Sequence, residues 1–326
     1  MKRTALLLVV ALLAGCASAP DEPIGADHPS AVAPRPLGVS DPAVVAQPST
    51  PPDCGNPEAS YRPVRALPAP GRMPRNSTME TIVKRGRLII GTDQNANLLS
   101  YLNPEGQLDG FEIDLARRIA AALFPDGATN PNRIQFRHIT TADRIPILER
   151  GEVDMVIRTM TMNCARWQQI NFSSGYLWAS QKLLVNKGSN IQSMQDIAAR
   201  RGKICATSGS TSIAKISAYP DVVPVSADLT VDCMLMLQQG QIDAVSTNDT
   251  ILLGLAAQDP GTHIVGDPLS SELSGIGIQK SQVDLVRFVN KVLEGLRTSG
   301  FLTERYEHWL GDLPGAPPAL PADYRD

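Results

Sequence analysis

The chain of 326 residues is predicted to fold into two tandem α/β units with a ligand cleft between them. Apolar strands alternate with helical segments along most of its length, which is typical of mainly parallel sheets. The length exceeds what one ordinary core needs and suits two lobes with extensions. A hydrophobic content of 43% and a charged content of 19% are those of a soluble globular protein.

Residues 1–16 have the parts of an export signal. Lys2 and Arg3 form the basic region, residues 5–14 are apolar and too few to span a bilayer, and a small residue precedes Cys16. This arrangement resembles the bacterial lipobox, in which cleavage leaves a lipid-modified cysteine at the N-terminus. The resemblance implies an extracytoplasmic protein anchored through Cys16 to the outer face of the cell membrane, or a periplasmic one. A plain secreted protein with a chance cysteine here is the alternative.

Residues 17–75 are rich in proline and poor in large apolar side chains. Fourteen of the 26 prolines in the chain lie here, among Ala, Ser and Asp. Such a composition favours a semi-extended chain over a packed core. We therefore expect 17–75 to be a tether, and 313–326 to be a Pro/Ala tail with nothing to bury.

Periodicity and turn residues predict the elements of the folded part, which begins near Met79. The first unit is expected to contain a helix at 78–86, a strand at 87–91, a helix from Gly110 to Pro125, a strand at 133–138, a helix at 143–150 and a strand at 153–157. The second unit is expected to contain strands at 203–206, 222–225 and 244–246, with helices at 210–218 and 232–239. The segments 275–278, 282–300 and 304–310 then add a strand and two helices.

The stretch from Arg158 to Ser173 is the strongest candidate for ligand contact. Thr159 and Thr161 alternate along a segment expected to be extended, which would put both hydroxyls on one face. Arg166 follows, and a short turn would bring its guanidinium beside them. Two hydroxyls, backbone N–H groups and a planar cation suit a carboxylate, which guanidinium binds through two parallel hydrogen bonds. An exposed arginine in a surface salt bridge is the alternative that these residues alone leave open.

Several function classes find no support in the sequence. The formal net charge of −3 gives no reason to expect a nucleic-acid partner, and the four histidines have no metal-ligand spacing. Gly275 and Gly277 lack the third glycine of a dinucleotide loop. No Ser-His-Asp or Cys-His arrangement stands out. We expect no metal, no cofactor and no catalytic residue.

Four motifs occur in order along the chain. They are Gly110-Phe111-Glu112-Ile113-Asp114-Leu115; Thr159-x-Thr161-x4-Arg166 followed by Asn171-Phe172-Ser173; Thr207-Ser208-Gly209-Ser210-Thr211-Ser212; and Asn248-Asp249-Thr250. Together, over roughly residues 79–311, they resemble the extracellular solute-binding proteins of family 3 for polar amino acids, the type II periplasmic-binding-protein receptors of ABC transporters. The similarity is greatest to the glutamate/aspartate branch and to actinobacterial glutamate- or glutamine-binding lipoproteins.

The resemblance implies a division of the chain into lobes. Lobe 1 would comprise residues 76–180 and 275–312, and lobe 2 residues 181–274. Two crossing strands near Gln181 and Ser274 would form the hinge, with the ligand cleft between the lobes.

The resemblance also implies a role for each candidate residue in holding a zwitterion. Arg166 would bind the α-carboxylate together with the hydroxyls of Thr161 and Thr211. Asp249 would accept from the ammonium beside the Thr159 hydroxyl, although an N-cap role for Asp249 is an equally good interpretation. The other loop residues expected at the ligand are Thr207, Ser212 and Asn248.

The resemblance places a second anion site at the ligand side chain, where Thr141 and Arg144 would hold a distal carboxylate. Asp93 departs from this pattern, because the glutamate/aspartate branch has a basic residue at that place. Asp93 could pair with Arg144 and weaken its pull on an acid, or accept from a side-chain amide. The sequence therefore leaves the preference for acid or amide open.

Export favours disulfide bonds, and the four cysteines besides Cys16 permit three connectivities. The implied lobes favour pairing Cys205 with Cys233 inside lobe 2. Cys54 would then pair with Cys164 in lobe 1.

The function implied is that of a monomeric, lipid-anchored receptor. It would bind glutamate or aspartate, and glutamine or asparagine with them, close on the ligand and deliver it to an ABC-transporter permease. A sensor lipoprotein that signals to a membrane partner would have the same binding site. An enzyme of the same fold, with Asp93 or Asp249 as general acid or base, is the other alternative.

Overall fold

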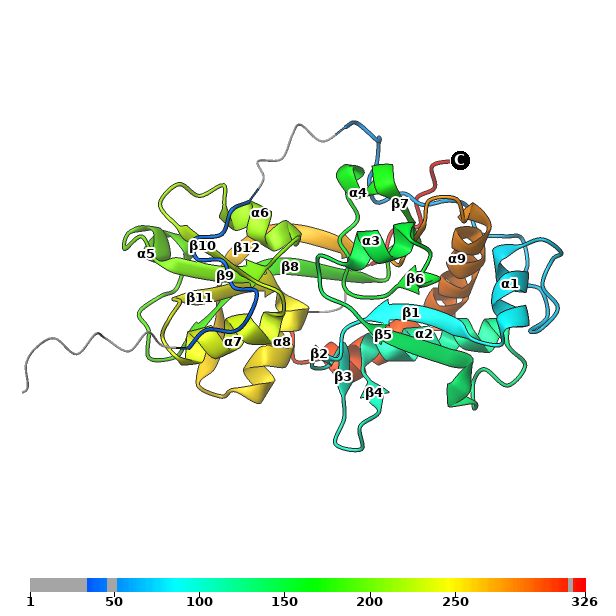
Figure 1. Ribbon diagram of the computed structural model, residues 1–326, viewed down its shortest axis with the longest axis horizontal. Helices are drawn as coiled ribbons and strands as arrows, with labels where there is room; N and C mark the ends of the chain where they lie inside the picture. The colour runs from blue at the N-terminus through cyan, green and yellow to red at the C-terminus, as the bar shows by residue number, and fades with distance from the viewer. Residues whose placement is uncertain (1–33, 46–51, 316–318) are drawn as a thin grey trace, which may run out of the picture. The chain divides into compact units, whose positions relative to one another are not determined.

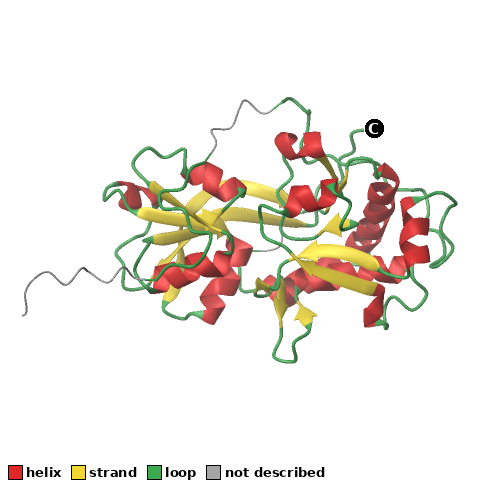
Figure 2. Cartoon of the chain, in the orientation of Figure 1, coloured by secondary structure: helices red, strands yellow, loops and turns green. Residues whose placement is uncertain are grey.

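A computed structural model describes residues 34–45, 52–315 and 319–326. Within it, Arg35–Asp326 form one compact unit that contains two five-stranded sheets, each flanked by helices (Figures 1 and 2). The export signal and Cys16 lie outside the described residues. None of the described helices is both long enough and apolar enough to cross a membrane.

Lobe 1 is built on a sheet with the strand order β5-β1-β6-β13-β7, in which β1, β5 and β6 are parallel. Its strands are β1 (Leu88–Thr92), β5 (Ile134–His138), β6 (Met155–Val156), β7 (Ile170–Phe172) and β13 (Gly277–Gln279). Its helices are α1 (Thr78–Arg85), α2 (Phe111–Leu123), η1 (Pro131–Arg133), α3 (Arg144–Glu149), α4 (Cys164–Gln169), α9 (Val283–Thr298) and α10 (Phe301–Leu310). A small sheet of β2 (Asn95–Ala96), β3 (Ser100–Leu102) and β4 (Leu108–Asp109) lies beside it.

Lobe 2 is built on a sheet with the strand order β10-β9-β11-β8-β12. Its strands are β8 (Leu177–Asn186), β9 (Lys203–Thr207), β10 (Val223–Ala227), β11 (Ala244–Asn248) and β12 (Thr262–Ser274). Its helices are α5 (Met194–Ala198), α6 (Thr211–Ile216), α7 (Thr230–Gln238) and α8 (Asp249–Gln258). The expected elements are therefore present, with ends that differ by a few residues.

Two long strands connect the lobes and form the hinge. β8 and β12 pair antiparallel from Thr262 opposite Asn186 to Ser274 opposite Leu177, with an irregularity after Val265 (Figure 1). Ser274 also forms a bridge with Thr161 of lobe 1. The hinge therefore runs directly into the segment that carries the candidate ligand residues.

Two glycines show why the lobe 1 helices begin and end where they do. Gly86 adopts a left-handed conformation after α1, and its N–H donates to the carbonyls of Ile82 and Val83. Gly110 precedes α2 with φ 125°, and a Cβ there would lie 2.4 Å from the Leu99 oxygen. Only glycine fits at this entry to α2, so close packing requires the glycine that begins the motif at residues 110–115.

The proline-rich segment is more folded than its composition predicts. The Ser40 N–H donates to the Ser226 oxygen, and the Ala43 N–H to the Pro224 oxygen, so part of the expected tether pairs with β10 of lobe 2. Further on, the Trp167 indole donates to the Pro57 oxygen at 2.7 Å. The expectation of a free tether through residue 75 is wrong for these described parts.

The expected tail also packs against lobe 1. The Ser60 N–H donates to the Asp323 oxygen, and the Arg325 N–H to the Ser60 oxygen. The Arg325 guanidinium lies 3.7 Å from the centre of the Trp167 ring. Residues 319–326 therefore cover a buried tryptophan, contrary to the expectation of a tail with nothing to bury.

Both expected disulfides are present. Cys54 is bonded to Cys164 at the start of α4, and Cys205 on β9 is bonded to Cys233 in α7. The first bond joins the proline-rich segment to lobe 1, and the second lies within lobe 2.

Candidate ligand-binding site

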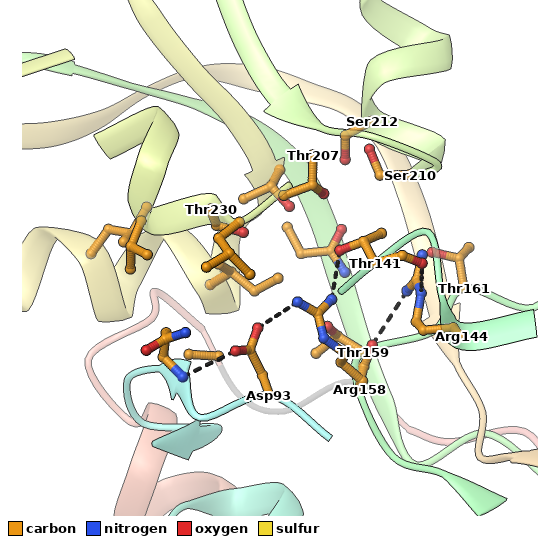
Figure 3. A pocket seen from close by; sticks show the side chains of 18 of the residues that line it. Asp93, Thr141, Arg144, Arg158, Thr159, Thr161, Thr207, Ser210, Ser212 and Thr230 are labelled. Atoms are coloured by element: carbon orange, nitrogen blue, oxygen red, sulfur yellow. Dashed lines mark hydrogen bonds and ion pairs between the residues drawn. The ribbon is translucent and has the colours of Figure 1, made fainter. Parts of the chain in front are cut away.

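A cavity of roughly 690 Å³, part of it open to solvent, lies between the lobes (Figure 3). Nine of the eleven residues expected at the ligand line it: Asp93, Thr141, Arg144, Thr159, Thr161, Thr207, Thr211, Ser212 and Asn248. Arg166 and Asp249 are not among the lining residues.

The fold explains why residues so far apart in sequence meet here. Asp93 follows β1, Thr141 comes shortly after β5, and Arg158 shortly after β6. In lobe 2, Thr207 ends β9 and Asn248 ends β11. The carboxyl ends of neighbouring parallel strands open at one edge of a sheet, and the two sheets turn these edges toward the same cavity.

The segment with the two threonines is not the extended strand that we expected. β6 ends at Val156, and Thr159 has φ 40°, in the left-handed region. The Thr159 N–H donates to Glu112 Oε1 at 2.6 Å and to the Tyr176 hydroxyl at 3.1 Å. Both threonines line the cavity, so backbone strain at Thr159, and not regular alternation, positions them.

The partner of Asp93 is Arg158, a residue to which the sequence analysis gave no role. Arg158 Nη2 donates to Asp93 Oδ2 at 2.6 Å, and Nη1 donates to the Thr141 hydroxyl at 2.6 Å (Figure 3). Both charged side chains are buried. Of the two roles that the sequence left open for Asp93, pairing with Arg144 is therefore excluded. An arginine placed directly after an apolar strand was the available signal.

Arg144 is a buried cation without an ion pair. Its Nε donates to the Thr141 carbonyl at 2.9 Å and its Nη1 to the Arg158 carbonyl at 3.3 Å. No carboxylate among the described residues lies within 4.0 Å of it. Burial, followed by repulsion from Arg166 and Arg158, holds the pKa of Arg144 well below its ordinary value. Arg144 is thus poised to receive an anion.

Arg166 is a second buried cation without an ion pair. The Asn163 side chain caps α4 by accepting from the Arg166 N–H. The guanidinium donates to the Thr161 carbonyl at 2.7 Å and to the Gly209 carbonyl of lobe 2 at 3.5 Å. Burial lowers the pKa of Arg166 to about 10, opposed by attraction to Glu272. Because Arg166 is buried and forms no ion pair with a described residue, the alternative of an exposed salt bridge is excluded.

Glu272 on β12 is a buried carboxylate that the sequence analysis missed. Its Oε2 accepts from the hydroxyls of Thr161 and Thr211, the latter at 3.0 Å, and its Oε1 accepts from Ser270 Oγ at 3.1 Å. The residue is 6% exposed, and no cation in the described part of the chain lies within 4.0 Å. A charged residue in a hinge strand was the signal that would have found it.

Asp249 does not face the ligand cavity, which corrects its expected role. It opens α8, and its Oδ1 accepts from the backbone N–H groups of Ser180 at 3.1 Å and Thr250 at 2.9 Å. Its side chain borders a different cavity, with Lys182 and Tyr306. Burial raises the pKa of Asp249. The preceding residue, Asn248, lines the ligand cavity in its place.

Glu112 is a further acid at the cavity that the sequence analysis did not assign. It lies in the first turn of α2 and is 1% exposed. Its Oε1 accepts from the Tyr176 hydroxyl and the Thr159 N–H. Burial raises the pKa of Glu112, although both hydrogen bonds and the charge of Arg158 oppose this.

The lobes also touch where α8 meets the segment after β2. The Asn97 amide of lobe 1 donates to the Gly254 carbonyl of α8 at 3.2 Å. A Cβ at Gly254 would lie 2.3 Å from the Asn97 oxygen, so only glycine allows this approach.

Comparison with known proteins agrees with this architecture. Residues 88–312 match the family described as bacterial extracellular solute-binding proteins, family 3. The ABC transporter glutamine-binding protein GlnH of Bacillus subtilis (strain 168) is 31% identical over 242 residues, covering 74% of this chain and 87% of that protein. The glutamate-binding protein GluB of Corynebacterium efficiens is 32% identical over 235 residues, covering 68% of this chain and 79% of that protein.

A solved structure shows the same fold. An ancestral arginine-binding protein bound to glutamine aligns with a TM-score of 0.63 at 31% identity, covering 70% of this chain and 99% of that one. The two lobes, the β8–β12 hinge and the cavity between the lobes agree with this likeness. Since the family match spans more than half of its length, the chain belongs to the bacterial extracellular solute-binding proteins, family 3.

Proposed function

We propose that this receptor binds the acidic amino acids L-glutamate and L-aspartate between its lobes, and glutamine and asparagine more weakly. The observation that carries the proposal is that Arg144, Arg166 and Glu272 are buried and that none of them has a group of opposite charge within 4.0 Å among the described residues. An acidic amino acid carries two carboxylates and one ammonium. It is therefore the charge complement of two guanidinium groups and one carboxylate.

The other charges at the cavity leave this balance unchanged. Asp93 and Arg158 neutralise each other in an ion pair. Glu112 is already engaged by the Tyr176 hydroxyl and the Thr159 N–H, and burial raises its pKa. An amide ligand would bring only one carboxylate and leave one guanidinium unpaired in a cleft that excludes water. Because a buried charge without a partner is costly, we expect acids to bind more tightly than amides.

Arg166 and Arg144 have different tasks in this proposal. Arg166, beside Thr161, holds the α-carboxylate that all amino acids share. Arg144, beside Thr141, holds the side-chain carboxylate. Ligand contacts to both lobes favour the closed form, in which residues 76–180 and 275–312 meet residues 181–274.

The receptor would present its ligand to an ABC-transporter permease, since relatives carry the names of ABC-transporter binding proteins. A membrane sensor is the alternative partner, and the site is the same for both. One chain supplies every group of the site, so we propose that it acts as a monomer, anchored through a lipid on Cys16. It binds without converting its ligand, because Asp93 is held in an ion pair and Asp249 lies in another cavity.

Titration calorimetry tests this function with glutamate, aspartate, glutamine and asparagine on the wild type and two variants. Micromolar binding would correspond to about −8 kcal/mol. Arg166→Ala should lower the affinity for all four ligands by at least roughly thirtyfold, because the variant leaves the α-carboxylate of each ligand unpaired. Arg144→Ala should weaken the two acids far more than the two amides.

Two results would contradict the proposal. Tighter binding of the amides by the wild type would show that the unpaired cations do not select the ligand. Equal losses for acids and amides in Arg144→Ala would show that Arg144 is structural.

A further inference from the structure

We propose that Glu272, and not an acid of lobe 2, accepts the α-ammonium group of the bound amino acid. The inference rests on the proposed function, because it assigns the third charge of that ligand. An ammonium group leaving water needs an anionic acceptor, since buried charges are stable only when paired and hydrogen-bonded. Four carboxylates lie in or near the cleft: Asp93, Glu112, Asp249 and Glu272.

Three of these carboxylates are committed elsewhere. Asp93 pairs with Arg158 through Oδ2, and its Oδ1 accepts from the N–H groups of Gln94 and Asn95. Glu112 accepts from the Tyr176 hydroxyl and the Thr159 N–H within the body of lobe 1.

Asp249 accepts from two backbone N–H groups at the start of α8 and borders another cavity. The neighbouring position that does line the ligand cavity is Asn248, a neutral side chain. Lobe 2 therefore offers no anion to the ligand at this place.

Glu272 differs from the other three in its neighbours. Among the described residues, its carboxylate accepts hydrogen bonds from hydroxyl groups alone, those of Thr161 in lobe 1, Thr211 in lobe 2 and Ser270 in the hinge. Thr161 and Thr211 both line the ligand cavity, and their oxygens are 3.4 Å apart. The hydroxyls of Thr161 and Thr211 thus lie between Glu272 and the ligand cavity, next to the proposed α-carboxylate site at Arg166.

On ligand binding, the hydroxyls of Thr161 and Thr211 would exchange one hydrogen-bond acceptor, Glu272, for another, the α-carboxylate. A hydroxyl has a single proton to donate. In the structure, Thr161 and Thr211 donate it to Glu272. When the ammonium group binds Glu272, it supplies up to three donors, and the two hydroxyls are released to turn toward the α-carboxylate. Ligand binding then neutralises Glu272 and recruits donors from both lobes in one step.

The test compares glutamate with glutarate, which has the same two carboxylates and no ammonium group. In Glu272→Gln, glutamate affinity should fall at least about tenfold, as expected for loss of a charged hydrogen-bond partner. Glutarate affinity should stay the same or rise, because the variant removes a carboxylate that repels it. Glu272→Asp, which keeps the charge, should retain more glutamate affinity than Glu272→Gln. Asp249→Asn is the matched control and should change neither ligand.

Each other outcome has a definite meaning. Tighter binding of both ligands by Glu272→Gln would show that Glu272 competes with the ligand for the two hydroxyls. An equal loss for both ligands would assign Glu272 a structural role. A loss confined to glutamate in Glu112→Gln, and absent in Glu272→Gln, would make Glu112 the acceptor. Failure of the wild type to bind glutamate or aspartate would overturn the proposed function itself, and is visible before any variant is made.

Discussion

At the scale of single residues, the ion pair of Asp93 with Arg158 determines which arginines of the pocket stay unpaired. Three arginines lie buried in or beside the cavity, and Asp93 neutralises only Arg158. This leaves Arg144 with carbonyl acceptors alone. The acid therefore fixes Arg158 and Thr141 in place, and it does not cancel the charge that attracts an anionic ligand.

Glu112 gives a prediction for the pH dependence of stability. Burial raises its pKa in the folded protein, whereas in the unfolded chain the carboxyl ionises near about 4.3. Above that pH the folded state keeps a proton that the unfolded state has lost, so a rise in pH favours unfolding. Glu112→Gln keeps an acceptor oxygen and removes the titration. Without ligand, the unfolding temperature of the wild type should fall relative to the variant as the pH rises above about 4.3, the ordinary pKa of a glutamate.

Circular-dichroism melting of both proteins over this range checks the prediction. Groups common to the two proteins cancel in the difference between the curves. Parallel curves would show that the folded carboxyl titrates near its ordinary value.

The site residues were predictable from the sequence only in part. Motif spacing fixes where the backbone of Thr161, Thr207 or Arg144 lies, because each follows or opens an element of a known fold. The ion pair of Asp93 was not predictable, because three arginines have the same chemistry and the choice depends on side-chain paths. Glu272 was missed because its partners come from both lobes and are distant in sequence.

At the scale of elements, α8 touches lobe 1 at Gly254, and this contact requires glycine. The Gly254 carbonyl accepts from Asn97 of lobe 1, and a Cβ at Gly254 would lie 2.3 Å from the Asn97 oxygen. Gly254→Ala should therefore hold the lobes apart and reduce glutamate affinity at least about tenfold, a cost of about 1.4 kcal/mol in closure. The helix itself should gain about 1 kcal/mol from the substitution.

Gly295→Ala is the matched control, because Gly295 lies within α9 and a Cβ there would meet nothing within 4 Å. It should raise the unfolding temperature and leave affinity unchanged. Calorimetric titration and thermal melting of both variants separate the two effects. Unchanged affinity in Gly254→Ala would show that binding does not need this approach of the lobes.

Strands and helices with clear periodicity were predicted well, and irregular ones were not. α9 and β1 match the expected segments closely, because the apolar residues of α9 repeat at the helical period and β1 is a continuous apolar run that ends at a glycine and a threonine. β12 was missed over most of its length, because residues 266–272 are largely polar and show no alternation. Pairing with β8 holds this strand extended, and that is tertiary information.

At the scale of the whole molecule, composition predicted that the proline-rich segments would not pack against the lobes, and their described parts do pack. A proline-rich segment cannot form a hydrophobic core of its own. Its backbone N–H and C=O groups can still form hydrogen bonds with the surface of a folded lobe. Residues near Ser40 do this at β10, and residues near Ser60 do it between lobe 1 and the segment at Asp323. Segments poor in apolar residues thus became part of the folded unit through hydrogen bonds and one covered tryptophan.

The two disulfides allow a prediction about stability. Cys54 and Cys164 are 110 residues apart, and Cys205 and Cys233 are 28 apart. The chain-entropy model assigns about 4–5 kcal/mol to the first bond and about 3–4 kcal/mol to the second. Replacing either pair with serines should lower the free energy of unfolding, more so for the first pair, and leave glutamate affinity unchanged. Urea unfolding and calorimetric titration check both parts. A loss of affinity would show that a disulfide positions the site.

Neither disulfide joins lobe 1 directly to lobe 2. The hinge strands Leu177–Asn186 and Thr262–Ser274 contain no cysteine. Reduction would therefore leave both hinge strands intact, while it releases the proline-rich segment from α4 and β9 from α7.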